Sequence, residues 1–325
     1  MSINNGDVLT DQQLDDAVHE LVLRAGEAGM IPIAGIMSER QSDGRQQVVG
    51  FGWNRLREGI PGIHGETGAI MNMGRLPGGY SNLTATSSLS PCPFCQSSLA
   101  LHLGIREIRI LDATNYKPDF SGYAKIGLTP VISEHRGIIE TFGEWVRDPA
   151  NAVIWSRDIG EWSVPVSRPF DVTMMHDRAM ALVELAHRQA QAAEEADEAP
   201  IGAVVADRFG EAIGAGHARI VMNNDPSAVA ALVAWRACGA RDHWRDKTLI
   251  LTAGPDHIAY SMFHVFKFGQ LLVASTRVFS GRLDDVEKSG VPVHPLGDAR
   301  SDTRLLRWID RVGPARAREY TGQQP

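Results

Sequence analysis

Two short motifs in the first half of the chain most constrain its fold. One is His64-Gly65-Glu66, and the other is Pro91-Cys92-Pro93-Phe94-Cys95. One imidazole and two thiolates can fill three positions of a tetrahedral zinc ion and leave the fourth for water. If these groups share one ion, the fold must bring two distant segments into contact.

The spacing inside each motif favours a helix start. If Cys92 opens a helix, with Pro91 at its start and Ser90 as its cap, Cys95 follows one turn later on the same face. Both sulfurs can then reach one metal, and the helix N-terminus stabilises the thiolate form. His64 can begin a second helix, so the sequence predicts that two helix starts meet.

Glu66 supplies the remaining group that hydrolysis at such a site requires. Bound zinc can lower the pKa of water from about 15.7 to about 7, and a carboxylate that is not a ligand can then move protons. Neither motif is specific by itself, because H-x-E occurs by chance and P-C-x-x-C also forms redox dithiols or structural half-sites. Cys238 is solitary, so no second cysteine pair exists. Together, in this order, the two motifs match the signature of zinc deaminases.

Composition limits the remaining possibilities. At 325 residues the chain is long enough for two domains of ordinary size. Three cysteines, no signal peptide and no apolar run of membrane length indicate a cytoplasmic protein without a membrane partner. A net charge of -7 argues against a large nucleic-acid footprint, so the expected partner is a small-molecule substrate.

A weak internal repeat organises the chain. Helical spacing over residues 11–29 precedes the strand-like segment 32–37, and the same order recurs at 175–193 and 200–205. In this register Gly52-Trp53-Asn54 corresponds to Gly216-His217-Ala218, and residues 86–89 correspond to residues 249–252. The second half then has other residues at every catalytic position of the two motifs: Val229 for His64, Ala231 for Glu66, Asp256 for Cys92 and Ala259 for Cys95. The alternative is that any two α/β domains share this order of helices and strands.

The repeat predicts two α/β domains, each with a mixed sheet covered by helices on both faces. We expect a catalytic domain over residues 1–161, a linker over 162–170 where prolines interrupt any helical period, and a second domain over 171–325.

The chain resembles the cytidine deaminase-like superfamily, and the first domain looks most like the fungal-type cytosine deaminases. The similar segments span nearly all of residues 8–161 and include Gly52-x-Asn54, His64-Gly-Glu66-Thr67, Gly74-Arg75-Leu76, Leu89-Ser90-Pro91-Cys92, Gly104-Ile105-Arg106, Asn115-Tyr116-Lys117 and Trp155-Ser156-Arg157-Asp158-Ile159-Gly160-Glu161. The resemblance implies tandem three-layer α/β/α domains with mixed central sheets. It also implies that the last of these segments closes over a bound base.

The resemblance implies a role for each matching residue. These roles are zinc ligation by His64, Cys92 and Cys95, proton transfer by Glu66, base recognition by Asn54 and Asp158, and a lid formed by Tyr116, Trp155 and Ile159. Gly65 lets backbone approach the ligand closely. From the residues alone, packing in the core is the favoured interpretation of the two aromatic side chains, and Asp158 could equally cap a helix. The family usually has phenylalanine where this chain has Tyr116, which leaves room for a substrate more polar than cytosine.

The second domain resembles a degenerate tRNA adenosine deaminase domain. Asn224-Asp225-Pro226-Ser227-Ala228 is retained, but it runs into Val229-Ala230-Ala231 and not into a metal-binding motif. We expect this domain to act as a pseudo-catalytic partner that forms an intramolecular pseudo-dimer with the first. A homo-oligomer is left open.

The sequence therefore predicts a zinc aminohydrolase that releases ammonia from a free pyrimidine base, cytosine or a close analogue. Three alternatives stay open. One is the same chemistry on a triazine, a pterin, a creatinine-like ring or a secondary-metabolite pyrimidine. Another is a base-sensing regulatory pseudoenzyme, which an intact Glu66 argues against. A third is nucleic-acid editing, against which the acidic balance of the chain weighs.

Overall fold

The computed structural model describes residues 3–55, 58, 60, 62–74, 82–116, 120–158, 167–239, 243–313 and 317. Of residues 120–122 and 156–158 it describes the backbone alone. The chain divides into two compact units, Met1–Trp162 with Asp225–Ser227, and Ser163–Asn224 with Ala228–Pro325. None of the described helices is both long and apolar enough to cross a membrane.

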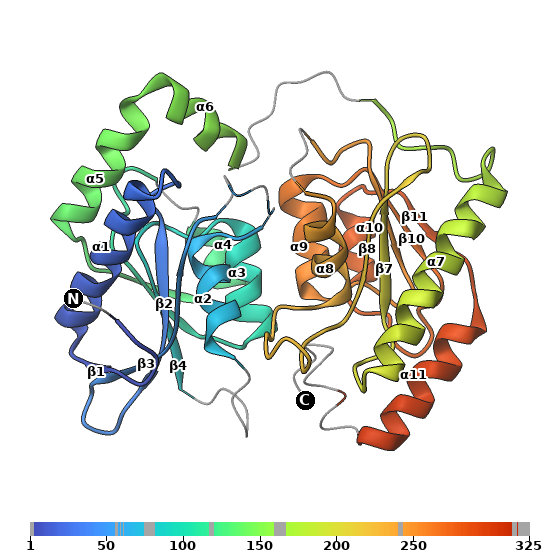
Figure 1. The fold of residues 1–325 in the computed structure, drawn as a ribbon, viewed down its shortest axis with the longest axis horizontal. Coiled ribbons are helices and arrows are strands. Elements are labelled where there is room, and N and C mark those ends of the chain that lie inside the picture. Colours follow the sequence, from blue (N-terminus) through green and yellow to red (C-terminus); the bar gives the residue numbers. More distant parts are fainter. Residues whose placement is uncertain are drawn as a thin grey trace. The chain divides into compact units, whose positions relative to one another are not determined.

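The first unit is an α/β/α sandwich (Figure 1). Its elements in chain order are β1 (Val8–Leu9), α1 (Asp11–Glu27), β2 (Ala34–Arg40), β3 (Gln46–Trp53), α2 (Gly65–Met73), β4 (Leu83–Ser87), α3 (Pro93–Ser97), η2 (Ser98–His102), β5 (Glu107–Ile110), α4 (Phe120–Lys125), β6 (Thr129–Ile132), α5 (Arg136–Arg147) and α6 (Pro149–Asp158). The described strands form a mixed sheet in the order β1-β3-β2-β4-β5-β6. The predicted mixed α/β fold is confirmed in this unit.

Alternating side chains along the strands give this sheet two buried faces. Ile36 of β2 packs with Leu14, Val18 and other apolar residues of α1. Met37, the next residue, points to the opposite face and packs with Ile70 of α2. Because successive side chains of a strand point to opposite sides, one strand serves both helix layers.

The second unit repeats this topology. Its elements are α7 (His176–Glu195), β7 (Gly202–Ala206), β8 (Ala212–His217), α8 (Ala230–Ala237), β9 (Thr248–Leu251), α9 (His257–Phe266), β10 (Gln270–Val273), α10 (Leu283–Lys288), β11 (Val293–Pro295) and α11 (Ala299–Val312). The described strands pair in the order β11-β10-β9-β7-β8. In both sheets the first long strand, β2 or β7, pairs antiparallel with two neighbours, and the strand pairs that follow β4 or β9 are parallel. The short strand β1 adds one more antiparallel pair, with β3.

The registers of the two sheets match residue by residue. Ala34 pairs with Trp53, and Gly202 pairs with His217, which agrees with the register predicted for that segment. Each sheet has an irregularity at the same place, after Met37 and after Val205. The predicted match of residues 86–89 with residues 249–252 is wrong by one residue. Strand pairing with β2 and with β7 places residue 86 opposite the same sheet position as residue 250, and not 249.

Glycines allow helix α2 to lie close to the sheet. An ideal Cβ on Gly52 would fall 2.4 Å from the backbone carbon of Gly68, and one on Gly50 would fall 2.4 Å from the carbonyl oxygen of Ala69. The second unit has Gly216 at the position of Gly52. No other residue permits this separation, so these glycines set the position of the helix that begins after His64.

We expect Gly52→Ala to lower the free energy of unfolding by about 1–3 kcal/mol, because the added methyl group must displace helix α2. Urea denaturation measures this effect. Gly26→Ala is the matched control, since the nearest atom to its new Cβ is 4.0 Å away in an exposed helical position. That variant should be stabilised by roughly 0.5–1 kcal/mol. Equal stability of the two variants would show that helix α2 does not depend on a glycine at position 52.

Candidate metal and active site

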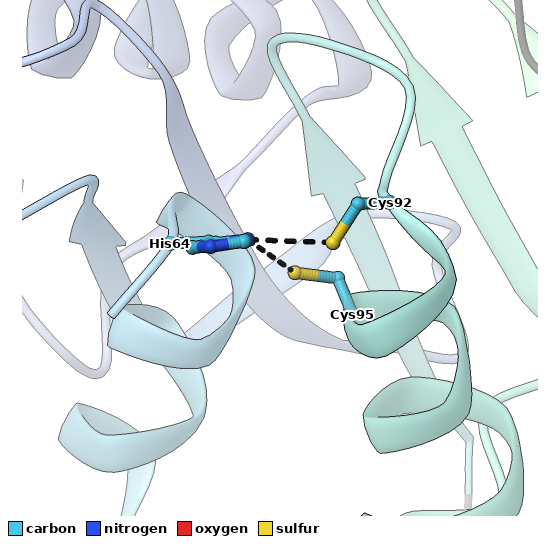
Figure 2. Close-up of side chains that lie close together, drawn as sticks. All are labelled: His64, Cys92 and Cys95. Carbon is cyan, nitrogen blue, oxygen red and sulfur yellow. Dashed lines mark hydrogen bonds between the residues drawn. The ribbon is translucent and has the colours of Figure 1, made fainter. Parts of the chain in front are cut away.

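His64 and Cys92 occupy equivalent positions on two helices. His64 is the N-cap residue of α2, and Cys92 is the N-cap residue of α3. Both have extended backbone conformations and both carbonyl groups accept the first helical hydrogen bond. The two predicted helix starts therefore meet, as Figure 2 shows.

The start of α3 differs in detail from the prediction. The helix begins at Pro93 and has Cys92 as its N-cap, so Pro91 and Ser90 lie outside it. The residue before a proline is driven out of the helical region by the proline ring, so Cys92 cannot be the first helical residue. Proline fits well in the first turn of a helix, which explains why α3 starts at Pro93.

Three candidate ligand atoms converge at the two helix starts. His64 Nδ1 lies 3.4 Å from Cys92 Sγ and 3.3 Å from Cys95 Sγ. All three ligand atoms lie within 4.8 Å of one another (Figure 2). Among the described residues, this is the sole group of three or more metal-ligating side chains with such geometry.

The local structure holds these ligands in place. Thr67 Oγ1 accepts a hydrogen bond from the His64 backbone N–H at 2.8 Å and donates one to the Gly62 carbonyl group at 2.8 Å. The Gln96 side chain donates to the Pro91 carbonyl group, and the hydroxyl groups of Ser90 and Tyr123 lie 2.8 Å apart. Both turns that present the ligands are therefore fixed by buried polar contacts.

The chemistry of the donor set fits a soft divalent cation. A hydrogen bond with Cys95, together with the nearby His64, holds the pKa of the Cys92 thiol well below its ordinary value. Burial raises the pKa of the Cys95 thiol. Two sulfurs and an imidazole nitrogen are the ligands that zinc takes in tetrahedral sites with an open fourth position.

Glu66 lies in the first turn of α2 beside the three ligands. Its side chain is buried, and one carboxylate oxygen, Oε1, accepts a hydrogen bond from Ser87 Oγ at 2.8 Å. Burial raises the pKa of this carboxyl group, while His64 and the Ser87 hydrogen bond oppose that rise. A carboxyl group with a raised pKa holds a proton more readily than an exposed one.

A small cavity that is partly open to solvent adjoins this group. Three of the residues predicted to contact substrate line it: Asn54, Tyr116 and Trp155. The Tyr116 and Trp155 rings meet edge to face at 5.5 Å, and Trp155 also contacts Phe142 at 5.2 Å. Figure 1 shows that α6, which carries Trp155, follows α5 on the same side of the unit.

The structure describes only part of the remaining residues that were predicted to contact substrate. Asp158 ends helix α6, and its side chain lies outside the described part of the structure, as does all of Ile159. Most of the predicted linker, residues 162–166, is also outside the described residues. A Cβ on Gly65 would lie 2.8 Å from the backbone of Ala34, so this glycine has a packing role against β2.

Sequence reasoning missed several residues of the cavity wall and of the site. Ile33, Leu89 and Ser90 line the cavity, and Ser87 contacts Glu66 from strand β4. Only Ser90 had a local signal, since it precedes the Pro91-Cys92 pair. The others come together through strand pairing, which a motif search does not see.

Comparison with known proteins finds a fungal enzyme that is similar to part of the chain. No protein-family model matches. A cytosine deaminase of Candida albicans is 28% identical over 116 residues, which is 35% of this chain and 75% of the relative. This similarity accompanies a His64-Cys92-Cys95 cluster with a buried glutamate beside it. These findings support the resemblance of the chain to the cytidine deaminase-like superfamily.

Solved structures of two other deaminases resemble part of the chain. A tRNA:A34 deaminase structure is 24% identical and covers 39% of this chain and 99% of its own length, with a TM-score of 0.36. The guanine deaminase of Nitrosomonas europaea is 19% identical, covers 40% of this chain and 84% of its own length, and has a TM-score of 0.34. At TM-scores below 0.5 these likenesses do not bear on function.

We expect the purified protein to hold about one zinc ion per chain, because one group with suitable ligands is present in the described residues. Cys92→Ala should lose the metal, as metal analysis of the folded variant would show. Cys238→Ala is the matched control, because Cys238 is buried and its thiol donates a hydrogen bond to the Ala234 carbonyl group. Zinc retained in Cys92→Ala, or two tightly bound ions in the wild type, would contradict this assignment.

Proposed function

We propose that the protein is a hydrolytic deaminase that releases ammonia from a free amino-heterocycle, with cytosine or a close analogue as the substrate. The single observation that carries this proposal is the position of Glu66. It is a buried acid that lines the same cavity as His64 and Cys92 and is not among the clustered ligand atoms. The relationship to a cytosine deaminase supports the choice of base.

His64, Cys92 and Cys95 would hold the zinc ion, through one nitrogen and two sulfur atoms. When bound, zinc supplies the Lewis acidity that makes a water molecule nucleophilic near neutral pH. A site that had only a structural purpose would have no need of a buried carboxyl group at its open side.

Glu66 would move the protons of the reaction. It takes one from the attacking water and delivers it to the ring nitrogen beside the amino-bearing carbon. A carbon–oxygen bond forms, the exocyclic carbon–nitrogen bond then breaks, and the amino group leaves as ammonia after a further proton transfer. The raised pKa of Glu66 suits a group that alternates between its two protonation states.

The cavity wall would select and orient the base. The Asn54 amide can donate to and accept from the polar edge of a ring, and Tyr116 and Trp155 offer aromatic faces. Tyr116 is the feature that favours a second candidate, an amino-heterocycle with an additional polar group, because its ring lies in the cavity wall.

We further propose that the second unit has no deaminase activity of its own. Val229 and Asp256 are the N-cap residues of α8 and α9, which correspond to α2 and α3 in the repeated topology. A valine offers no ligand atom, and the Asp256 carboxylate caps its own helix by accepting from the Ala259 N–H at 2.8 Å.

The decisive experiment measures ammonia release by the protein from a panel of amino-heterocycles. The panel contains cytosine, guanine, adenine, an aminotriazine, a pterin and creatinine. Release from one of them by the zinc-loaded protein would support the proposal. No release from any, with zinc bound, would favour the regulatory alternative. Tyr116→Phe in the same panel tests whether the hydroxyl group selects a more polar ring.

We expect Glu66→Gln to reduce ammonia release by at least about a hundredfold while zinc content stays unchanged, because the group moves protons. Steady-state kinetics and metal analysis check both parts. Glu107→Gln serves as the control, since that carboxylate is half-exposed on β5 and pairs with Arg40. Near-normal turnover of Glu66→Gln would refute the proposed mechanism.

Asp158→Ala should lower kcat/KM by more than about tenfold, because the family resemblance assigns its carboxylate to the substrate. Its free energy of unfolding should stay within about 0.5 kcal/mol of the wild type. Glu144→Ala, at an exposed position of α5, is the control for both measurements. A large loss of stability in Asp158→Ala would instead assign this residue a role in the fold.

A further inference from the structure

Ser87 ends strand β4 beneath Glu66. Its side chain is fully buried, and its hydroxyl group donates to Glu66 Oε1 at 2.8 Å. On the neighbouring strand β2, Gly35 pairs with Ser87, and a Cβ on Gly35 would lie 3.3 Å from the Glu66 Cα atom. The carboxyl group of Glu66 therefore lies over two strands, one of which provides a hydrogen-bond donor.

The terminal torsion of a glutamate side chain is broad, so a buried carboxylate needs contacts to fix its plane. A hydrogen bond to an ionised acceptor is stronger than one between neutral groups. The Ser87 hydroxyl group is well suited to this task, because the rigid β4 strand holds it at one end of the carboxylate. Proton transfer between water and a ring nitrogen requires an oxygen atom that is held in one place.

The second unit shows that the fold does not require a hydroxyl group at this position. Ser87 pairs with Gly35, and the matching pair in the second sheet is Leu251 with Ala203. Leu251 is buried in its sheet just as Ser87 is. The counterpart of Glu66 there is Ala231, the second residue of α8, so the serine and the glutamate are both absent.

The next residue along the strand behaves in the opposite way. Ser88 Oγ accepts a hydrogen bond from the Ala34 backbone N–H at 2.9 Å. In the second unit, Thr252 Oγ1 accepts the corresponding bond from the Gly202 N–H at 3.0 Å. This hydroxyl group is present in both units and satisfies the backbone, whereas the Ser87 hydroxyl group is present only where a glutamate accompanies it.

We propose that Ser87 is a positioning residue that fixes the orientation of the Glu66 carboxyl group for proton transfer. This inference rests on the proposed function. It makes the serine at the end of β4 part of the catalytic arrangement through its hydrogen bond to Glu66.

The test compares Ser87→Ala, Ser87→Thr and Ser88→Ala in the zinc-loaded, full-length protein, with cytosine as the first substrate. We expect Ser87→Ala to lose about tenfold to a hundredfold in kcat, with KM changed by no more than about twofold, because only proton transfer is misaligned. Ser87→Thr keeps the hydroxyl group and should restore most of the rate. Ser88→Ala should be less stable toward urea but should keep the kcat of the wild type.

A crystal structure of Ser87→Ala gives a readout that is independent of activity. The Glu66 carboxyl group should be rotated or divided between orientations, while His64, Cys92 and Cys95 stay in place. An unmoved Glu66, a wild-type kcat, or a rise in KM at unchanged kcat would each overturn the inference. If Ser87→Ala does not fold, Ser87→Cys replaces it, because a thiol is a weak donor.

The proposed function and the positioning role of Ser87 fail in different ways. If the wild-type protein releases no ammonia from any member of the panel, the proposed function fails, and the crystal structure alone then tests whether Ser87 orients Glu66. If the wild type is active and Ser87→Ala matches it, only the positioning role is lost.

Discussion

The arrangement of the site depends on how closely helix α2 approaches strands β2 and β3. Gly52 and Gly65 lie so close to neighbouring backbone that neither has room for a Cβ atom. A Cβ on Gly52 would lie 2.4 Å from the backbone of Gly68, and one on Gly65 would lie 2.8 Å from the backbone of Ala34. Gly35 adds a close approach to Glu66 itself. The helix therefore lies directly on the sheet, and its first turn holds Glu66 above the ends of two strands. Bulkier residues at these positions would move the acid away from the cavity that it shares with the metal ligands.

The second unit has kept only part of this close approach. The two glycines of β3, at positions 50 and 52, have the glycines Gly214 and Gly216 as their counterparts. The two glycines nearest to Glu66, at positions 35 and 65, are replaced by Ala203 and Ala230. Packing of a helix against the neighbouring strand thus requires glycine in both units. The contacts around the acid require glycine only where the acid is present, which separates the demands of the fold from those of the site.

The sequence predicted the mixed α/β fold of both units and the meeting of two helix starts, because hydrophobic periodicity and ligand spacing are local patterns. It misplaced the start of α3, since the effect of Pro93 on Cys92 outweighs the apparent cap at Ser90. It also aligned residue 86 one position away from its true counterpart. Register in a sheet is set by pairing between strands, and a one-residue slip is not visible in composition. The contact of Ser87 with Glu66 has the same non-local origin.

Helix α9 of the second unit begins where the first unit has its cysteine motif, and its first N–H groups need a hydrogen-bond acceptor in place of that motif. In the first unit the Cys92 side chain makes no capping hydrogen bond to α3. At the corresponding position Asp256 accepts a hydrogen bond from the Ala259 N–H, the residue that matches Cys95. A carboxylate at an N-cap is favourable without any ion. The substitution therefore exchanges a helix start that suits a thiolate and a metal for one that is satisfied by the chain alone.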